Sequence, residues 1–174
     1  PQGYGDLVLT GNVQSDLVPR TAVAGPHGIV YEDPETHRAM VNYGGGSQQL
    51  VTNCTFIENV SSYGGAVHNV YTNVEARYSH CLFMGNVASK RGGAMNSSGV
   101  VGPFGSRVIM DHCTFVGNSA AQNGGALADS HASVSTVANC VFSGNTATLE
   151  GGAIYCGNAS TLSLLNASMS ANQA

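Results

Sequence analysis

The chain repeats one phrase four times, and this repeat is the feature that most constrains its fold. Each copy has a Cys, a Phe two residues later, an Asn three residues after the Phe, and then Gly-Gly-Ala with an apolar residue. The copies begin at Cys54, Cys81, Cys113 and Cys140. A fifth begins at Ala167, with Met169 at the Phe position, and reaches Asn172. A fixed period of this kind is typical of repeat architectures.

The spacing of the copies sets the length of the repeating unit. Successive cysteines are 27, 32 and 27 residues apart, and Ala167 follows Cys140 by a further 27 residues. The long interval includes residues 99–105, a segment with three Gly and one Pro that we interpret as an insertion in a loop. Removing about five residues there restores the period.

Alternation of apolar residues inside each unit predicts β-strands. Cys and Phe are one residue apart, and a second, mostly apolar pair lies three and five residues before the Cys. These pairs are Tyr78/Ala76, Met110/Val108, Val137/Ser135 and Leu164/Leu162. The two pairs are an odd number of residues apart, so the chain must bend between them to keep both inside.

The residue before each Cys occupies this expected bend. These residues are Asn53, His80, His112, Asn139 and Asn166. Asn tolerates the left-handed conformation that such a bend requires. A third strand should follow the Gly-Gly pair, whose glycines supply unusual backbone angles and let neighbouring coils approach closely.

Three short strands per unit, with no helical period, predict an all-β fold: a right-handed, single-stranded parallel β-helix. Its coils stack about 4.8 Å apart, so equivalent residues form ladders. The predicted ladders are Cys54, Cys81, Cys113 and Cys140; Phe56, Phe83, Phe115 and Phe142; and Asn59, Asn86, Asn118 and Asn145. We expect buried cysteines, with a disulfide between neighbouring rungs as an alternative and a metal site less favoured. Cys156 lies outside the ladder and is the candidate disulfide partner or free thiol.

These phrases resemble the repeats of chlamydial polymorphic outer-membrane proteins, which pair Phe-x-x-Asn with Gly-Gly-Ala and an apolar residue. The resemblance covers residues 51–174, and it implies a β-helix. Members of that family are surface-exposed autotransporter passengers implicated in adhesion. The resemblance therefore implies an extracellular or cell-surface location.

Residues 1–50 lack the phrase, so we divide the chain into an N-terminal segment, 1–50, and a β-helix, 51–174. Strands are predicted at 6–10 and 28–31, separated by proline turns. We interpret the segment as a cap, an irregular first coil, or an arm that pairs with a neighbouring molecule. Glu32, Asp33, Glu35 and His37 form a cluster that we expect to be a solvated turn, with a cation site as the alternative.

Composition narrows the functional classes. Charged residues make up 9% of the chain and the formal net charge is -4, so nucleic acid is not an expected partner. No apolar run approaches the roughly 18 residues that span a bilayer. The start does not read as a signal peptide, so we expect a mature form or a fragment.

An enzyme is the alternative class, because β-helices include polysaccharide lyases and hydrolases. Glycoside hydrolysis needs two carboxylates on one face, whereas the acidic residues of the repeats fall at different repeat positions. These residues are Glu58, Glu75, Asp111, Asp129 and Glu150. His80 and His112 share a position on adjacent coils and could take a metal, but Asn in the other copies favours a hydrogen-bonding turn. We expect no cofactor.

Five Asn match the N-glycosylation signal: Asn53, Asn59, Asn96, Asn158 and Asn166. Asn59 belongs to the inner ladder, so Asn96 and Asn158 are the better candidates, and a chance match is the alternative. The favoured function is an extracellular structural or adhesive β-helix that forms a surface fibre or filament, with N-glycosylation as a further expectation. The fifth copy lacks its Gly-Gly-Ala, so we expect head-to-tail self-association through open ends. Glycans or cell-surface receptors are the expected ligands, and a monomeric carbohydrate-binding module is a further alternative.

Overall fold

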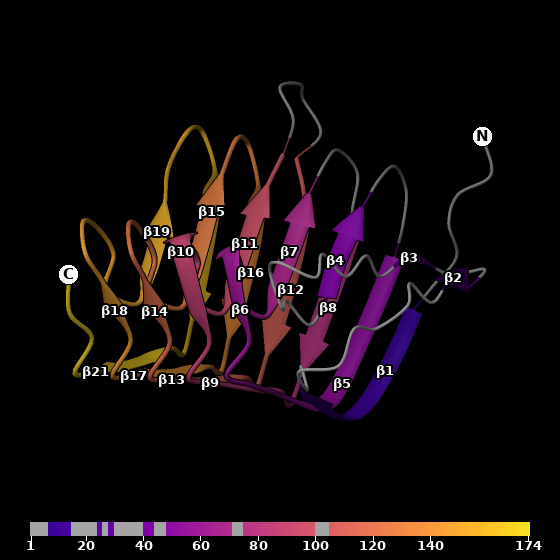
Figure 1. Cartoon of the computed structure of the whole chain (residues 1–174). Helices are drawn as coiled ribbons and strands as arrows, with labels where there is room; N and C mark the ends of the chain where they lie inside the picture. Colours follow the sequence, from indigo (N-terminus) through magenta and orange to yellow (C-terminus); the bar gives the residue numbers. More distant parts are fainter. Residues whose placement is uncertain are drawn as a thin grey trace.

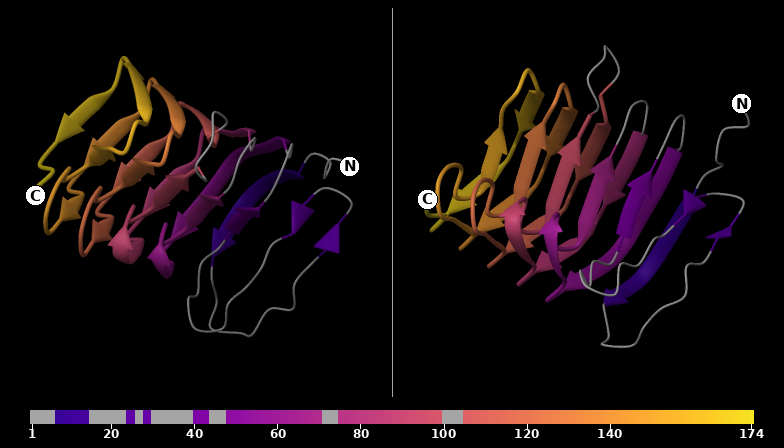
Figure 2. Two further views of the ribbon diagram at one scale, coloured as in Figure 1. Left: turned by 90° about the horizontal axis from the view of Figure 1, so that it is seen from above. Right: turned by 45° about the horizontal axis from the view of Figure 1, so that its top comes forward.

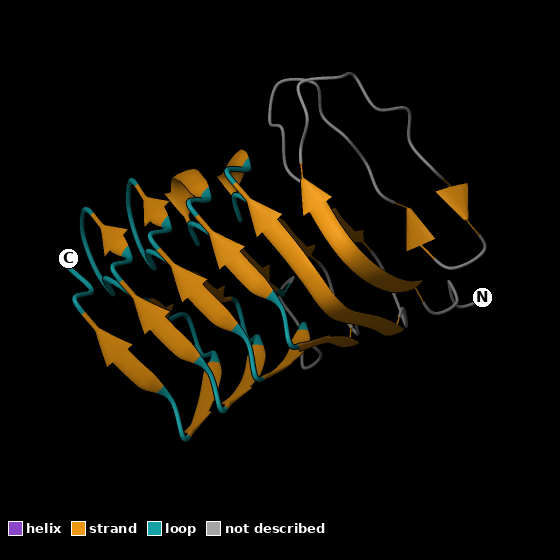
Figure 3. Ribbon diagram, turned by 90° about the horizontal axis from the view of Figure 1, so that it is seen from below, coloured by secondary structure: helices purple, strands orange, loops and turns teal. Residues whose placement is uncertain are grey.

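The computed structural model describes residues 7–14, 24–25, 28–29, 40–43, 48–70, 75–99 and 105–174, with side chains from residue 49 onward. Its strands form a row of stacked coils that runs from the N-terminal to the C-terminal side of the molecule (Figure 1). The described residues contain strands and loops and no helix (Figure 3). The predicted parallel β-helix with coils of about 27 residues is therefore confirmed.

The first two sides of each coil belong to one continuous sheet, because β5 (Gln48–Ile57) spans both. The first side continues through β8 (Glu75–Ser79), β12 (Arg107–Asp111), β16 (Val134–Ala138) and β20 (Thr161–Leu165). The second side continues through β9 (Leu82–Met84), β13 (Thr114–Val116), β17 (Val141–Ser143) and β21 (Ser168–Ser170).

The other two sides are separate parallel sheets. The third side consists of β6 (Val60–Tyr63), β10 (Val87–Arg91), β14 (Ser119–Ala120) and β18 (Thr146–Ala147). The fourth consists of β4 (Met40–Tyr43), β7 (Val67–Val70), β11 (Met95–Ser98), β15 (Leu127–Ser130) and β19 (Ile154–Cys156). Figure 2 shows the equivalent strands of successive coils lying side by side. The prediction of three strands per coil is wrong, because the third side was missed: β14 and β18 have two residues each, too few to show alternation.

The coils remain in register across the long interval. Ala76 and Tyr78 of β8 pair with Val108 and Met110 of β12, although 32 residues separate them. The extra residues therefore lie in the connection between the fourth side and the first. Residues 100–104 of the predicted insertion lie outside the described residues.

Three left-handed corners turn each coil. The first is the predicted bend, with φ between 51° and 55° at Asn53, His80, His112, Asn139 and Asn166. The second, not predicted, has φ between 52° and 64° at Glu58, Gly85, Gly117, Gly144 and Ala171. The third has φ between 58° and 68° at Gly64, Gly92, Gly124 and Gly151.

The two glycines of each Gly-Gly pair have different roles, one in the backbone angle and one in the close approach of coils. The first glycine, such as Gly92, provides the positive φ of the third corner. The second, Gly93, lies so close to the next coil that a Cβ there would overlap the carbonyl oxygen of Gly125. Each pair therefore turns the chain and lets successive coils approach closely.

The N-terminal segment contributes strands to the same stack. β1 (Leu7–Gln14) pairs in parallel with β5, and β4 pairs with β7. β2 (Ala24–Gly25) and β3 (Gly28–Ile29) form a small antiparallel pair. The predicted turn or cation cluster at Glu32, Asp33, Glu35 and His37 lies outside the described residues.

Candidate functional site

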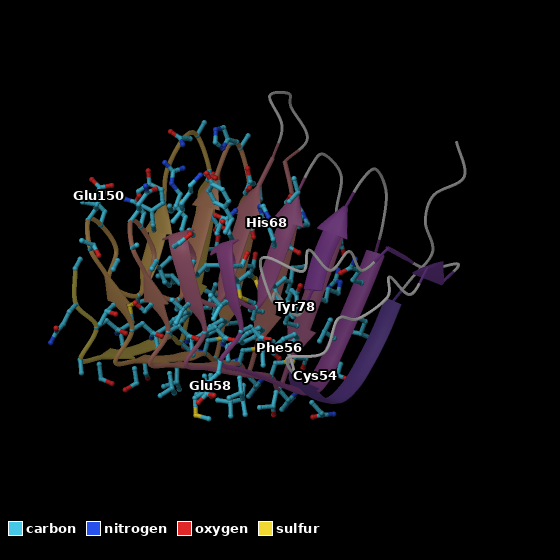
Figure 4. The ribbon with its side chains drawn as sticks, viewed as in Figure 1. Cys54, Phe56, Glu58, His68, Tyr78 and Glu150 are labelled. Carbon is cyan, nitrogen blue, oxygen red and sulfur yellow. The ribbon has the colours of Figure 1, made fainter. Side chains whose placement is uncertain are left out.

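The repeated phrase forms the interior of the coil. The four ladder cysteines are 1–2% exposed, and each thiol donates to the carbonyl oxygen two residues earlier, as Cys140 Sγ does to Ala138 at 3.0 Å. The rings of Phe56, Phe83, Phe115 and Phe142 stack in one file with centroids 4.6–4.7 Å apart. Figure 4 shows Cys54 and Phe56, both on β5, in the lower part of the molecule. These residues hold the core together and are not accessible to a ligand.

The Asn ladder is a continuous row of hydrogen bonds inside the second corner. The Oδ1 of Asn118 accepts from the backbone N–H of Asn86 at 3.0 Å and from its Nδ2 at 2.9 Å. The Nδ2 of Asn118 donates to the carbonyl of Phe83 at 3.0 Å and to Oδ1 of Asn145 at 2.9 Å. The same pattern joins Asn59 to Asn86 and Asn145 to Asn172. Both ladders are thus scaffold.

One candidate surface, which carries the predicted His80 and His112 pair, lies on the outside at the first corner. We call Asn53, His80, His112, Asn139 and Asn166 the bend row, since they occupy this corner on successive coils. The rings of His80 and His112 stack with centroids 5.0 Å apart and an interplanar angle of 3°. Asn166 Nδ2 donates to Asn139 Oδ1 at 3.2 Å, so the amides also bond along the row. Asn thus has a hydrogen-bonding role at this bend.

Asp111 is the charged neighbour of the bend row. Its Oδ2 lies 2.9 Å from His112 Nδ1, and its Oδ1 accepts from Asn139 Nδ2 at 2.8 Å. The hydrogen bond from Asn139, then that from His112, holds the pKa of the Asp111 carboxyl below its usual range. No group of three or more metal-ligating side chains occurs in the part of the chain that the structure describes. The five side chains of the row are exposed to solvent.

The acidic residues of the repeats lie in five different columns, where a column is the set of equivalent positions on successive coils. Glu75 aligns with Arg107, Asp111 with Ala138, and Asp129 with Ser97. Glu150 accepts from Asn123 Nδ2 at 3.0 Å on the third side, and Glu58 is at the second corner. In Figure 4, Glu58 lies at the lower edge of the molecule and Glu150 lies higher, towards the C-terminal end of the stack. None of these five carboxylates therefore stacks on another along the coil axis in the part of the chain that the structure describes.

The five glycosylation candidates fall into two groups. Asn53, Asn158 and Asn166 are exposed, and Asn158 lies in a turn closed by a hydrogen bond from Ser160 N–H to Gly157 O. Asn59 is fully buried and Asn96 is 1% exposed on β11. The expectation that Asn96 is a good acceptor is therefore corrected, because the folded coil leaves no room for a glycan there.

All five cysteines are free thiols, so the disulfide alternative has no counterpart within the chain. Cys156, on β19, is the exposed member. Burial, then the charge of Asp129, raises the pKa of its thiol. The thiolate population at neutral pH is correspondingly small.

Sequence reasoning missed the position of Asp129. Its side chain is 0% exposed inside the coil, on β15. The available signal was the period of two, because Asp129 follows the inward-facing Leu127 by two residues.

Comparisons with known proteins identify the repeat. Residues 112–129 and 139–157, about a fifth of the chain, match the family model of the Chlamydia polymorphic membrane protein repeat. No curated protein and no solved structure matches the chain. The described residues include no helix long and apolar enough to cross a membrane. Two units of this chain are thus similar to the polymorphic membrane protein repeat, and this repeat on a parallel β-helix fits a surface β-helix protein.

Proposed function

We propose that the chain is a structural and adhesive part of an extracellular surface protein, a unit of a fibre or filament. The observation that carries this proposal is the division of each coil into a repeated interior and a varied exterior. The inner column of the second side is Phe56, Phe83, Phe115 and Phe142, whereas the outer column beside it is Thr55, Leu82, Thr114 and Val141. Such a scaffold presents different side chains on one rigid surface.

Aromatic and cationic side chains around the third corner, at the end of the third side and on the fourth side, support a glycan as the ligand. Lys90 Nζ lies 4.9 Å from the ring centre of Tyr63, and the Tyr63 ring stacks against His68. The guanidinium of Arg91 lies 6.0 Å from the ring centre of Tyr155. Aromatic faces pack against sugar rings, and the neighbouring N–H groups can donate to sugar hydroxyls or carboxylates.

The stacking mode supports growth into a filament. Successive coils bond through backbone groups, as when Thr114 N–H donates to Cys81 O and Val141 N–H to Cys113 O. These bonds do not depend on side-chain identity, so a coil of a second copy can add in the same register. Head-to-tail addition of this kind propagates. The exposed Asn158, Asn53 and Asn166 are the proposed glycan attachment sites.

Binding of the 174-residue chain, fixed to beads, to a glycan panel and to cultured cells tests the adhesive part. We expect binding that Tyr63→Ser reduces at least tenfold, with Thr136→Ser, on the first side, as the matched control. Equal binding by the two variants, or none by the wild type, would contradict the proposal. Electron microscopy and intact mass test the rest, since monodisperse, unmodified particles would contradict the filament and the glycans.

A further inference from the structure

Asp129 is the buried carboxylate of the solenoid interior. Among the side chains that the structure describes, it is the one acidic group with no exposed surface. Neither carboxylate oxygen makes a hydrogen bond of good geometry, although the Ser135 and Ser97 hydroxyls lie near enough to favour the ionised form. It occupies a column in which β11 has Ser97 and β19 has Cys156.

The groups around Asp129 are uncharged. Along the stack lies Ser97, whose Oγ accepts from Asn69 Nδ2 at 3.3 Å. From β16, across the interior, comes Ser135, 1% exposed, whose Oγ likewise makes no hydrogen bond of good geometry. On the next coil lies the Cys156 thiol, which is the titratable group that faces the carboxyl. His131 follows in the turn after β15 and is exposed, and no described cation lowers the pKa of Asp129.

We propose that Asp129 is a proton-controlled switch of coil stability. Protonated, its carboxyl donates an O–H to the hydroxyl of Ser97 or Ser135 and adds no charge to the interior. Ionised, it places a charge without a compensating cation inside the coil, which weakens the packing between the first and fourth sides.

The direction of the pH dependence follows from the burial. Burial raises the pKa of Asp129 to about 6 from 3.8, against the opposing effect of the Ser135 and Ser97 hydroxyls. The folded chain therefore holds this proton more tightly than the unfolded chain. The stabilisation is complete below the unfolded pKa and is lost as the pH rises through about 6. A difference of about two pKa units corresponds to roughly a hundredfold change in the folding equilibrium constant.

Urea unfolding of the full chain at pH 5 and pH 8, followed by circular dichroism, tests the proposal. We expect the folding equilibrium constant of the wild type to be roughly tenfold larger at pH 5 than at pH 8, because pH 5 lies between the unfolded and folded pKa values of Asp129, and we expect Asp129→Asn to lose this difference. Asp111→Asn is the matched control, because Asp111 is an exposed carboxylate with a lowered pKa that stays ionised over this range. Equal pH dependence in the wild type and in Asp129→Asn would overturn the proposal.

A second measurement does not depend on whether Asp129→Asn folds. Carbon-13 NMR of the wild type labelled at aspartate carboxyls should show one carboxyl with a midpoint near pH 6, which Asp129→Ser removes. Ser is the residue that β11 has in this column. Titration of every aspartate below pH 5 would overturn the proposal.

Discussion

Replacing Asn118 by Ala tests whether the Asn ladder stabilises the coils. The side chain is fully buried and makes four hydrogen bonds: two are accepted from Asn86, and one each is donated to Phe83 O and Asn145 Oδ1. At a net value of about 1 kcal/mol for each bond, the substitution should cost about 4 kcal/mol of unfolding free energy. Its neighbours have no access to water, so the loss should not be compensated.

Two further variants separate polarity from volume. Asn118→Asp keeps the shape and the acceptor for Asn86, but it loses both donated bonds and buries a charge. It should therefore be at least as destabilising as Asn118→Ala at pH 7. Ser119→Ala is the matched control, since Ser119 faces outward on β14 and is partly exposed. It should change the free energy of unfolding by less than about 0.5 kcal/mol.

Urea unfolding followed by circular dichroism gives the global change, and hydrogen exchange gives the local one. The Asn86 amide, which donates to Asn118 Oδ1, should exchange much faster in Asn118→Ala than in Ser119→Ala. A solenoid can open locally, so the exchange rate of the Asn86 amide shows whether the loss of stability arises at the ladder or elsewhere in the chain. A loss below about 1 kcal/mol, with an unchanged Asn86 amide, would refute the reasoning.

Three other predictions address the packing. Gly93→Ala should prevent folding, because the added Cβ would overlap the backbone of Gly125. Gly117→Ala is the control: Gly117 has a φ of 61° but open space around it, so the change should lower the free energy of unfolding by only about 1–2 kcal/mol. Equal melting temperatures for the two variants would contradict the close approach of the coils at Gly93. Phe115→Asp should abolish the β-sheet circular dichroism signal by burying an unpaired charge between two stacked rings, and a surviving spectrum would refute the inward register. A thiol reagent should modify Cys156 alone in the native chain and all five cysteines in urea, and native labelling of more than one would contradict the burial of the ladder.

The sequence predicts the interior of the coil well, because buried positions carry strict size and period constraints. Cys113, directly before β13, and Phe115 on β13 both face inward. The φ of 51° at His112 follows from the odd offset between the inward-facing Met110 and Cys113. These are local consequences of keeping two apolar pairs on one side of the chain.

The solvent exposure of outward-facing residues is harder to predict, because a period of two distinguishes the two faces of a strand but does not show which other segments cover each face. Asn96 lies beyond a Gly-Gly pair and outside the inner Asn ladder, and on that ground we expected it to be accessible. It is instead 1% exposed on β11, and its backbone lies close to the third corner, where a Cβ at Gly92 would be 2.9 Å from the backbone N of Asn96. Contacts between different sides of a coil depend on three-dimensional closure, which the repeat spacing does not encode.

The repeated phrase and the function therefore belong to different parts of the coil. Residues that recur in every copy fill the interior or turn the corners, and a change there should alter stability before it alters recognition. Residues that differ between copies mostly face outward, where a change should alter binding on an intact scaffold. Asp129 departs from this division, because it varies within an inner column that has Ser97 on one side and Cys156 on the other. Ser97 and Cys156 carry no charge at neutral pH, so the feature that distinguishes Asp129 in this column is its ionisable carboxyl, and comparing Asp129→Asn with Asp129→Ser separates that charge from side-chain volume.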